Sequence, residues 1–181
     1  PWNHGFQSCV QGVELPAEGS DTVQAFNWFS RILQKGEMPQ KKVEYYAIGD
    51  GKWRIAEDYP FTACSEKRVY LSANDKRLTE FPGENAKLDY VYEPESPVPS
   101  HGAEAMLRSF EEIGSLQQPS PGWRDDVISF ISSPVQQDIP ILGKIEVLLY
   151  VSSDAADTAF SAKVMEVGHD GIARNIRSGI T

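Results

Sequence analysis

Residues 144–152 read Lys-Ile-Glu-Val-Leu-Leu-Tyr-Val-Ser, and this stretch is the clearest strand signal in the sequence. Ile145, Val147, Leu149 and Val151 occupy alternate positions, and alternate side chains of a strand point to the same face of a sheet. The pattern therefore predicts a strand over 144–152 whose apolar face lies in a core. A chain built around such strands belongs to the β class.

The stretch 158–167 is the expected neighbour of this strand. Its alternation places Phe160, Ala162 and Val164 in the same apolar layer and turns Ser161 and Lys163 to solvent. The connecting residues 154–157 leave two routes open, because they can form a hairpin or cross to a facing sheet.

Several further short stretches alternate in the same way and are bounded by Gly, Pro, Asn or Asp. A Gly49-Asp50-Gly51 turn joins the first two of them into a predicted hairpin. This spacing favours a β-sandwich or jelly roll. The remaining predicted strands are 43–48, 52–54, 67–73, 88–92, 126–132 and 172–176.

One segment has the period of a helix instead. Ser20-Asp21 supplies an N-cap, apolar residues then recur at helical spacing, and Lys35-Gly36 ends the pattern, so a helix is expected from about 21 to 35. Its apolar stripe is wide, which predicts heavy burial. The sequence does not decide whether residues 103–116 form a helix or an ordered loop. An extended surface strap is predicted from Pro94, Pro97 and Pro99.

Composition excludes some classes of function. The net charge is −9 and the Lys and Arg residues form no basic stripe, so we expect no nucleic-acid partner. No apolar run approaches the roughly 20 residues that span a bilayer, so we expect no membrane partner. Cys9 and Cys64 lie far apart without metal-site or disulfide spacing, and the sequence indicates no particular compartment.

The chain opens on Pro1-Trp2-Asn3-His4-Gly5. We interpret this opening as a cut inside a longer protein. If His4 is a catalytic base, its nucleophile lies upstream of Pro1.

Four segments in collinear order resemble the C-terminal region of the cocaine esterase and X-prolyl dipeptidyl-peptidase hydrolases. That family also includes α-amino-acid ester hydrolases and cephalosporin acylases. The likeness covers nearly the whole chain. The segments are residues 1–5, residues 46–60 with Tyr46-Ala47-Ile48-Gly49, Trp53-Arg54 and Tyr59-Pro60, residues 89–99 with Asp89-Tyr90-Val91-Tyr92-Glu93-Pro94 and Pro97-Val98-Pro99, and residues 149–171 with Leu149-Tyr150-Val151-Ser152-Ser153-Asp154, Phe160, Ala162-Lys163-Val164 and Asp170-Gly171.

The resemblance implies a serine hydrolase in which a jelly-roll domain, galactose-binding-like in architecture, follows an α/β-hydrolase catalytic domain. Residues 1–42, with the predicted helix, would be the end of the catalytic domain, and residues 43–181 an incomplete jelly roll. The Pro-Trp-x-His-Gly segment places the catalytic histidine at His4. The implied partners are the upstream catalytic domain of the same polypeptide and a small ester, amide or peptide substrate, with no cofactor and no metal.

The nucleophile of such an enzyme is not in this sequence. No Gly-x-Ser-x-Gly elbow occurs, and the triad of an α/β-hydrolase runs serine, acid, histidine along the chain. We therefore expect no hydrolysis by this chain alone. The family's jelly roll also continues beyond the position of Thr181, so an unpaired sheet edge is expected, through which a homo-oligomer could form.

Other candidate residues have structural interpretations. His101 and His169 are expected in solvated loops, and Asp154 with Asp157 could belong to a calcium site but better suits turn capping. Trp53 and Trp123 could stack on a sugar, although core or interdomain packing is the simpler interpretation.

Two alternatives to the hydrolase stay open at this stage. One is a non-catalytic β-sandwich module that binds carbohydrate or a protein. The other is a stable product of proteolysis or truncation.

Overall fold

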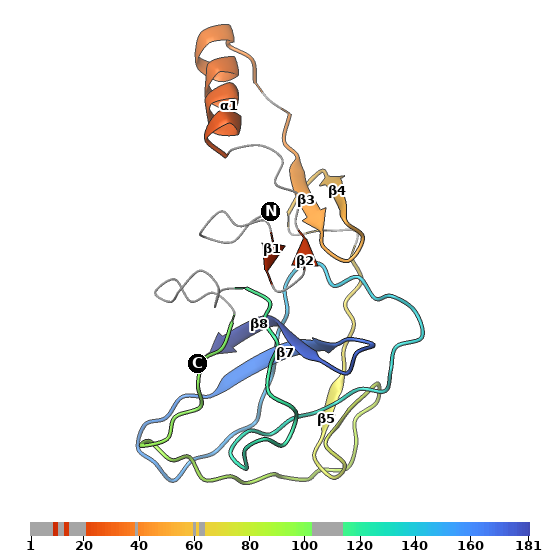
Figure 1. Cartoon of the computed structure of the whole chain (residues 1–181), viewed down its shortest axis with the longest axis vertical. Helices are drawn as coiled ribbons and strands as arrows, with labels where there is room; N and C mark the ends of the chain where they lie inside the picture. Colours follow the sequence, from red (N-terminus) through yellow and green to blue (C-terminus); the bar gives the residue numbers. More distant parts are fainter. Residues whose placement is uncertain are drawn as a thin grey trace. The chain divides into compact units, whose positions relative to one another are not determined.

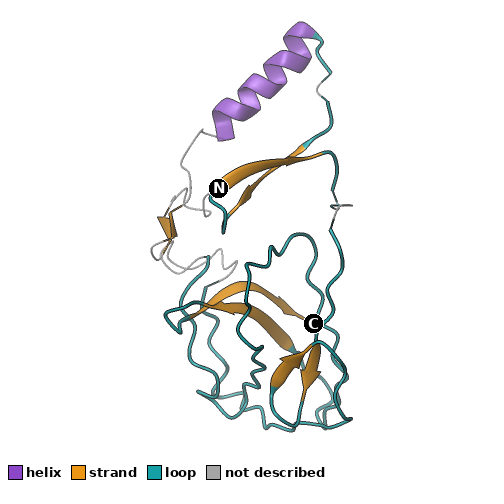
Figure 2. Ribbon diagram, turned by 90° about the vertical axis from the view of Figure 1, so that its right-hand side faces the viewer, coloured by secondary structure: helices purple, strands orange, loops and turns teal. Residues whose placement is uncertain are grey.

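The structure is a computed structural model of the chain, and it describes residues 9–10, 13–14, 21–38, 40–59, 61, 64–102 and 114–181. The chain divides into two compact units, Pro1–Cys64 and Ser65–Thr181, which are described separately. The architecture is mainly β, with one helix and four antiparallel strand pairs among the described residues (Figures 1 and 2). A jelly roll stays a prediction, because each of these pairs is a two-stranded sheet.

The first unit holds a helix with a well-defined end. Helix α1 spans Asp21–Lys35, which confirms the predicted bounds. It stops at Gly36, whose φ of 65° is in the left-handed region and whose N–H donates to the Ile32 carbonyl at 3.1 Å. Arg31 Nε also donates to Glu37 Oε2 at 2.8 Å across this end.

The apolar stripe of α1 is not buried, and that expectation was wrong. No described strand or helix covers it, so its large side chains are between 49% and 78% exposed. These side chains are Val23, Phe26, Trp28, Phe29 and Leu33.

Two strand pairs accompany the helix in this unit. Strand β1 (Cys9–Val10) pairs with β2 (Val13–Glu14), and β3 (Val43–Ala47) pairs with β4 (Lys52–Ala56), as the hairpin prediction required. The turn between β3 and β4 needs Gly51, which has a φ of 64° and donates its N–H to the Ala47 carbonyl at 2.9 Å. Tyr46 and Trp53 face each other across this hairpin with ring centroids 5.6 Å apart.

The second unit holds the other two pairs. Strand β5 (Tyr70–Ser72) pairs with β6 (Arg77–Thr79), and β7 (Ser161–Val167) pairs with β8 (Ala173–Ile180), with an irregularity between Val164 and Met165. Two isolated bridges join coil to these hairpins, Arg77 to Ile131 and Gln117 to Arg174. The second bridge brings the segment after residue 114 alongside β8.

The predicted strand over 144–152 is wrong. The segment makes no ladder in the structure, and its side chains from Val147 to Val151 are between 40% and 96% exposed. A strand needs a pairing partner, and the partner foreseen for this segment, residues 158–167, pairs instead with β8. Lys163, expected in solvent, is half-buried for the same reason.

The other strand predictions are confirmed only in part. The stretch 67–73 shortens to β5, and 172–176 lengthens to β8. Residues 88–92 form no strand, and 126–132 contribute only the bridge at Ile131. The proline-rich strap is exposed as predicted and joins no strand, and it contains a turn in which the Ser96 N–H donates to the Glu93 carbonyl at 3.0 Å.

The core of the second unit is small. Of the apolar side chains in the described ranges, only Leu116 and Ala173 are buried, at 1% and 6% exposure. Two polar residues, Gln118 and Asn175, are buried beside them. The centre of this unit is therefore partly a hydrogen-bonded network.

Candidate functional site

The one predicted catalytic residue, His4, lies outside the described residues. Its role therefore stays a prediction. Among the other histidines, His169 is exposed in the loop between β7 and β8, while His101 is half-buried. The main chain of His101, through its carbonyl oxygen, takes part in the buried network of the second unit.

The buried network centres on two amide side chains. Asn175 on β8 accepts the Leu116 N–H at 2.8 Å through Oδ1, and donates through Nδ2 to the Gly114 carbonyl at 3.0 Å. Gln118 Nε2 donates to the same Asn175 Oδ1 at 2.9 Å and to the carbonyls of Leu116 and His101 at 3.1 and 3.0 Å. Every polar side-chain atom buried within the described residues has a partner.

Lys163 on β7 completes this network. Its Nζ donates to Gln118 Oε1 at 2.7 Å and lies 3.5 Å from the His101 carbonyl oxygen. Burial lowers the pKa of the Lys163 ammonium below its usual value, because a low-dielectric site disfavours the charged form. Both of these acceptors are uncharged oxygens.

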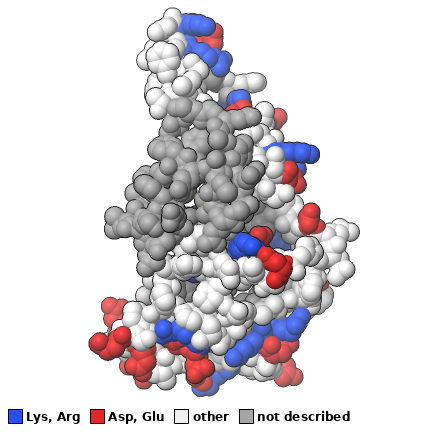
Figure 3. Space-filling view, in the orientation of Figure 1, with Lys and Arg blue, Asp and Glu red and all other residues white. Residues whose placement is uncertain are grey.

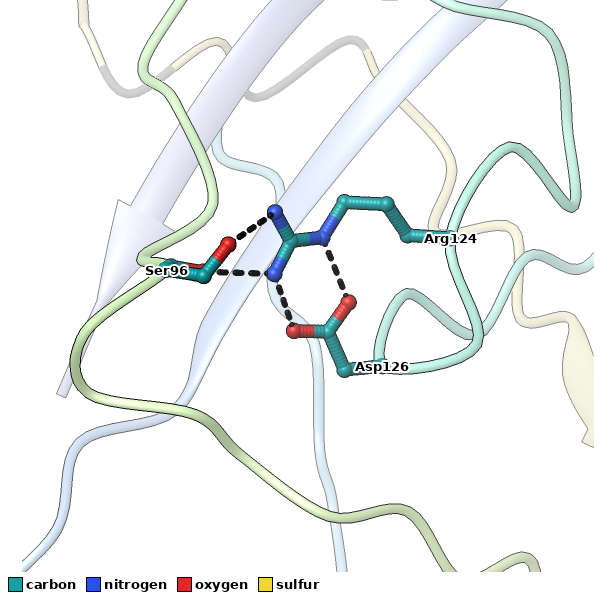
Figure 4. A network of polar contacts seen from close by, with 3 residues as sticks. All are labelled: Ser96, Arg124 and Asp126. Carbon is teal, nitrogen blue, oxygen red and sulfur yellow. Dashed lines mark hydrogen bonds and ion pairs between the residues drawn. The ribbon is translucent and has the colours of Figure 1, made fainter.

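A second polar cluster fastens the proline-rich strap (Figure 4). Arg124 donates from Nε and Nη2 to the two carboxylate oxygens of Asp126, at 2.7 and 2.6 Å, and from Nη2 to the Ser96 carbonyl at 2.6 Å. Nη1 also donates to Ser96 Oγ at 3.4 Å. The side-chain hydrogen bond from Arg124 lowers the pKa of the Asp126 carboxyl.

The candidate aromatic and acidic sites stay apart. Trp53 and Trp123 are 49% and 41% exposed, so core packing is wrong for both, and interdomain packing stays a prediction. Trp123 lies under the Arg124 guanidinium, with 5.6 Å between its ring centroid and Cζ. Beside Asp154, Ser153 Oγ accepts the Ala155 N–H at 3.1 Å, and turn capping by the carboxylates of Asp154 and Asp157 stays a prediction. In the described ranges no group of three or more His, Cys, Asp or Glu side chains is placed to hold a metal ion.

The described part of the second unit contains a surface hollow. The hollow has a volume of about 350 Å³ and is lined by residues that include Gln117, Ile131, Val167 and Ile172. On the face drawn in Figure 3, acidic and basic side chains of the described residues lie interspersed. No described helix is long and apolar enough to cross a bilayer.

Sequence reasoning missed the buried network. Asn175 and Ala173 share one face of β8, but only the register of β7 with β8 and the bridge from Gln117 to Arg174 bring Lys163 and Gln118 to it. The bridge from Gln117 to Arg174 joins residues more than fifty positions apart, so it leaves no local pattern. The single available signal was a polar residue on the same strand face as an apolar one.

Comparison with known proteins identifies the family. Residues 36–181 match the family model of the X-Pro dipeptidyl-peptidase C-terminal non-catalytic domain. The chain belongs to this family. The match begins at Gly36, one residue after the end of α1, and it confirms the resemblance drawn from the sequence.

The relatives of the chain are esterases. A cocaine esterase of Rhodococcus is 30% identical over 148 residues, which cover 77% of this chain and 26% of the relative. Two proteins that carry the name serine esterase, from Mycobacterium bovis and Mycobacterium tuberculosis, are each 22% identical over 187 positions, covering 99% of this chain and 29% of each relative. The chain thus spans less than a third of the length of these relatives. No solved structure matches it.

Proposed function

We propose that this chain is the C-terminal part of a serine hydrolase with an α/β-hydrolase catalytic domain, which cleaves ester or amide bonds. The observation that carries the proposal is the family match over residues 36–181, joined to esterase relatives more than three times as long as the matched segment. In this proposal residues 1–42 complete the catalytic domain, and residues 43–181 form a jelly-roll domain that follows it.

The position of α1 supports this division. The family match excludes residues 1–35, and α1 ends at Lys35. A helix whose apolar side chains are half or more exposed is typical of an element that packs against another body. The upstream catalytic domain is the partner that we assign to this stripe.

His4 is the general base in the proposed mechanism. An imidazole titrates near neutrality, so it can take the proton of an upstream serine hydroxyl and return it to the leaving group. The serine and the acid of the triad come earlier in the chain of such enzymes. The 181 residues alone are then catalytically inactive.

The test uses the full-length gene product and a chromogenic ester such as a p-nitrophenyl acyl ester. His4→Ala should lower kcat by about three orders of magnitude or more, because the serine loses its base. The matched control is His169→Ala, an exposed loop histidine, which should leave kcat and KM unchanged.

A fluorophosphonate probe separates the reaction class from the role of His4. The probe should label the full-length protein covalently and leave the 181-residue chain unlabelled, because the nucleophile lies upstream. Full activity in His4→Ala would overturn the assignment of the base alone. Failure of the full-length protein to react with either the ester or the probe would overturn the serine hydrolase itself.

A second function, recognition of carbohydrate or of a protein surface, is favoured by one observation. The Trp123 ring is 41% exposed in a domain whose family is described as non-catalytic. A glycan array on the 181-residue chain tests it, with Trp123→Ala as the matched variant. Specific binding that depends on Trp123 would support this second function, whereas the hydrolase proposal expects none.

A further inference from the structure

The buried network of the second unit has a direction. Lys163 carries only donors, so the Gln118 atom that meets it must be the side-chain oxygen; the Leu116 N–H likewise requires the oxygen of Asn175. The amide groups are therefore fixed in one orientation. Hydrogen bonds run from Lys163 to Gln118, from Gln118 to Asn175, and from Asn175 to the Gly114 carbonyl.

Aligned hydrogen bonds of this kind polarise one another and are costly to leave half-made in a buried site. Asn175 and Gln118 are 2% and 6% exposed, so water cannot replace a lost partner. Gly102 fits against the same Asn175 because it has no side chain, since a Cβ there would lie 2.6 Å from Asn175 Oδ1 and 2.8 Å from the Gly114 carbonyl oxygen.

Few charged or titratable groups of the described residues lie near Asn175. Lys163 reaches it only through Gln118, His101 contributes its carbonyl oxygen, and the neighbouring Arg174 on β8 pairs with Asp170 at 2.9 Å. Across the hairpin Asn175 is registered with Met165, which does not titrate. A carboxyl introduced at position 175 would have none of these cations as its direct partner.

We propose that Lys163, Gln118 and Asn175 form a one-way hydrogen-bond relay that holds the segments His101–Gly102 and Gly114–Gln118 against β8. Asn175 is the positioning residue, because among the described side chains it is the one that bonds to both Gly114 and Leu116 and lies against Gly102. The relay requires a donor at the Nδ2 position of Asn175, and a side chain of the same shape without that donor does not hold Gly114.

Asn175→Asp tests this requirement in the full-length protein, by hydrogen exchange of peptides that contain Leu116 and Gln118. At pH 7 the introduced carboxylate meets the Gly114 carbonyl oxygen with no proton, so protection of these amides should fall at least about five-fold. Burial raises the pKa of the introduced carboxyl above its usual value of about 3.9. As the pH falls toward 5 the carboxyl gains a proton, donates to Gly114, and the lost protection should return.

The controls distinguish the loss of the hydrogen-bond donor at position 175 from a change in side-chain shape. Asn175→Leu keeps the branching and the number of side-chain heavy atoms but has no titratable group, so its protection should be low at both pH values, and the unmodified protein should be protected at both. Gln136→Glu places the same isosteric change at an exposed site and should change nothing.

Wild-type protection in Asn175→Asp at pH 7 would overturn the relay, as would a loss that acid does not reverse. If the variant is insoluble at pH 7, purification at pH 5 followed by a jump to pH 7 gives the same comparison. Unfolding after the jump supports the proposal, and a stable fold after it contradicts the proposal.

Discussion

Gly102 occupies a position that no other residue fits. Its φ of 73° is in the left-handed region, and the space for a side chain is already taken by Asn175 and Gly114. Backbone strain and a steric conflict therefore act at the same residue.

Gly102→Ala should lower the free energy of unfolding by about 2 kcal/mol or more, measured by urea denaturation. Gly122→Ala is the matched control, because Gly122 has a φ of 78° but open space around its missing Cβ. Only the strain of about 1 kcal/mol applies there. Equal losses of unfolding free energy in the two variants would show that the steric conflict with Asn175 does not contribute to the destabilisation.

Residue by residue, the sequence is most informative where the cause of a conformation is local. Gly36 and Gly51 both have a positive φ at the ends of elements that the turn and cap signals had located. Lys163 and Asn175 are different, because their burial depends on the pairing of β7 with β8 and on a bridge to a distant segment. The turn at Gly168–Gly171 joins β7 to β8 locally, but no neighbouring residue encodes the bridge from Gln117 to Arg174, and the solvent-facing assignment of Lys163 failed for this reason.

Among the elements, the proline-rich strap is tied to another loop by the side chain of Arg124. Arg124 donates a hydrogen bond to the Ser96 carbonyl, and two more short hydrogen bonds from Arg124 go to the carboxylate of Asp126. Because Arg124 lowers the pKa of Asp126, the contribution of this pair to stability is present above the usual carboxyl pKa of 3.8. It is lost as the pH falls through the lowered value of the folded state.

Arg124→Gln should therefore destabilise the protein at pH 7, and the difference from wild type should shrink as the pH falls below about 3.8. Urea midpoints at pH 7, 5 and 3 measure it. Lys144→Gln is the control. It removes an ion pair between the Lys144 and Glu146 side chains, which are 79% and 72% exposed, so it should leave the urea midpoint unchanged. A difference that stays constant down to pH 3 would contradict the role of the Asp126 carboxylate.

The elements that were predicted well from the sequence are those stabilised by contacts among their own residues. Helix α1 has its own stop at Gly36, and the β3–β4 hairpin has its own turn and the Tyr46–Trp53 contact, so both appear at the expected residues. Residues 144–152 have an equally strong alternation but no described strand to pair with. Alternation specifies which side chains share a face, and pairing has to be supplied by another segment.

Across the described parts of the chain, many large apolar side chains are exposed. Large apolar side chains such as Phe26, Leu33 and Tyr150 are 66%, 78% and 96% exposed. A protein in water does not leave so much apolar area uncovered without a partner.

The 181-residue chain should consequently bind the dye 1-anilinonaphthalene-8-sulfonate and self-associate, whereas the full-length protein should do neither to the same extent. Dye fluorescence per chain and light scattering after gel filtration measure the two effects. Leu33→Lys with Phe26→Lys should reduce both in the isolated chain. A 181-residue chain that stays monomeric and does not increase the fluorescence of the dye would contradict the need for an upstream partner.

The left-handed glycine at the end of α1 has a consequence for how the protein can be rebuilt. Because Gly36 halts the helix by its own backbone geometry, the length of α1 does not depend on the residues C-terminal to this glycine. The β-rich portion could be swapped for that of a homologous hydrolase, spliced immediately after Gly36, without fraying or extending the helix. Chimeras joined after Gly36 should keep α1 at its natural length, whereas chimeras joined inside its turns should not.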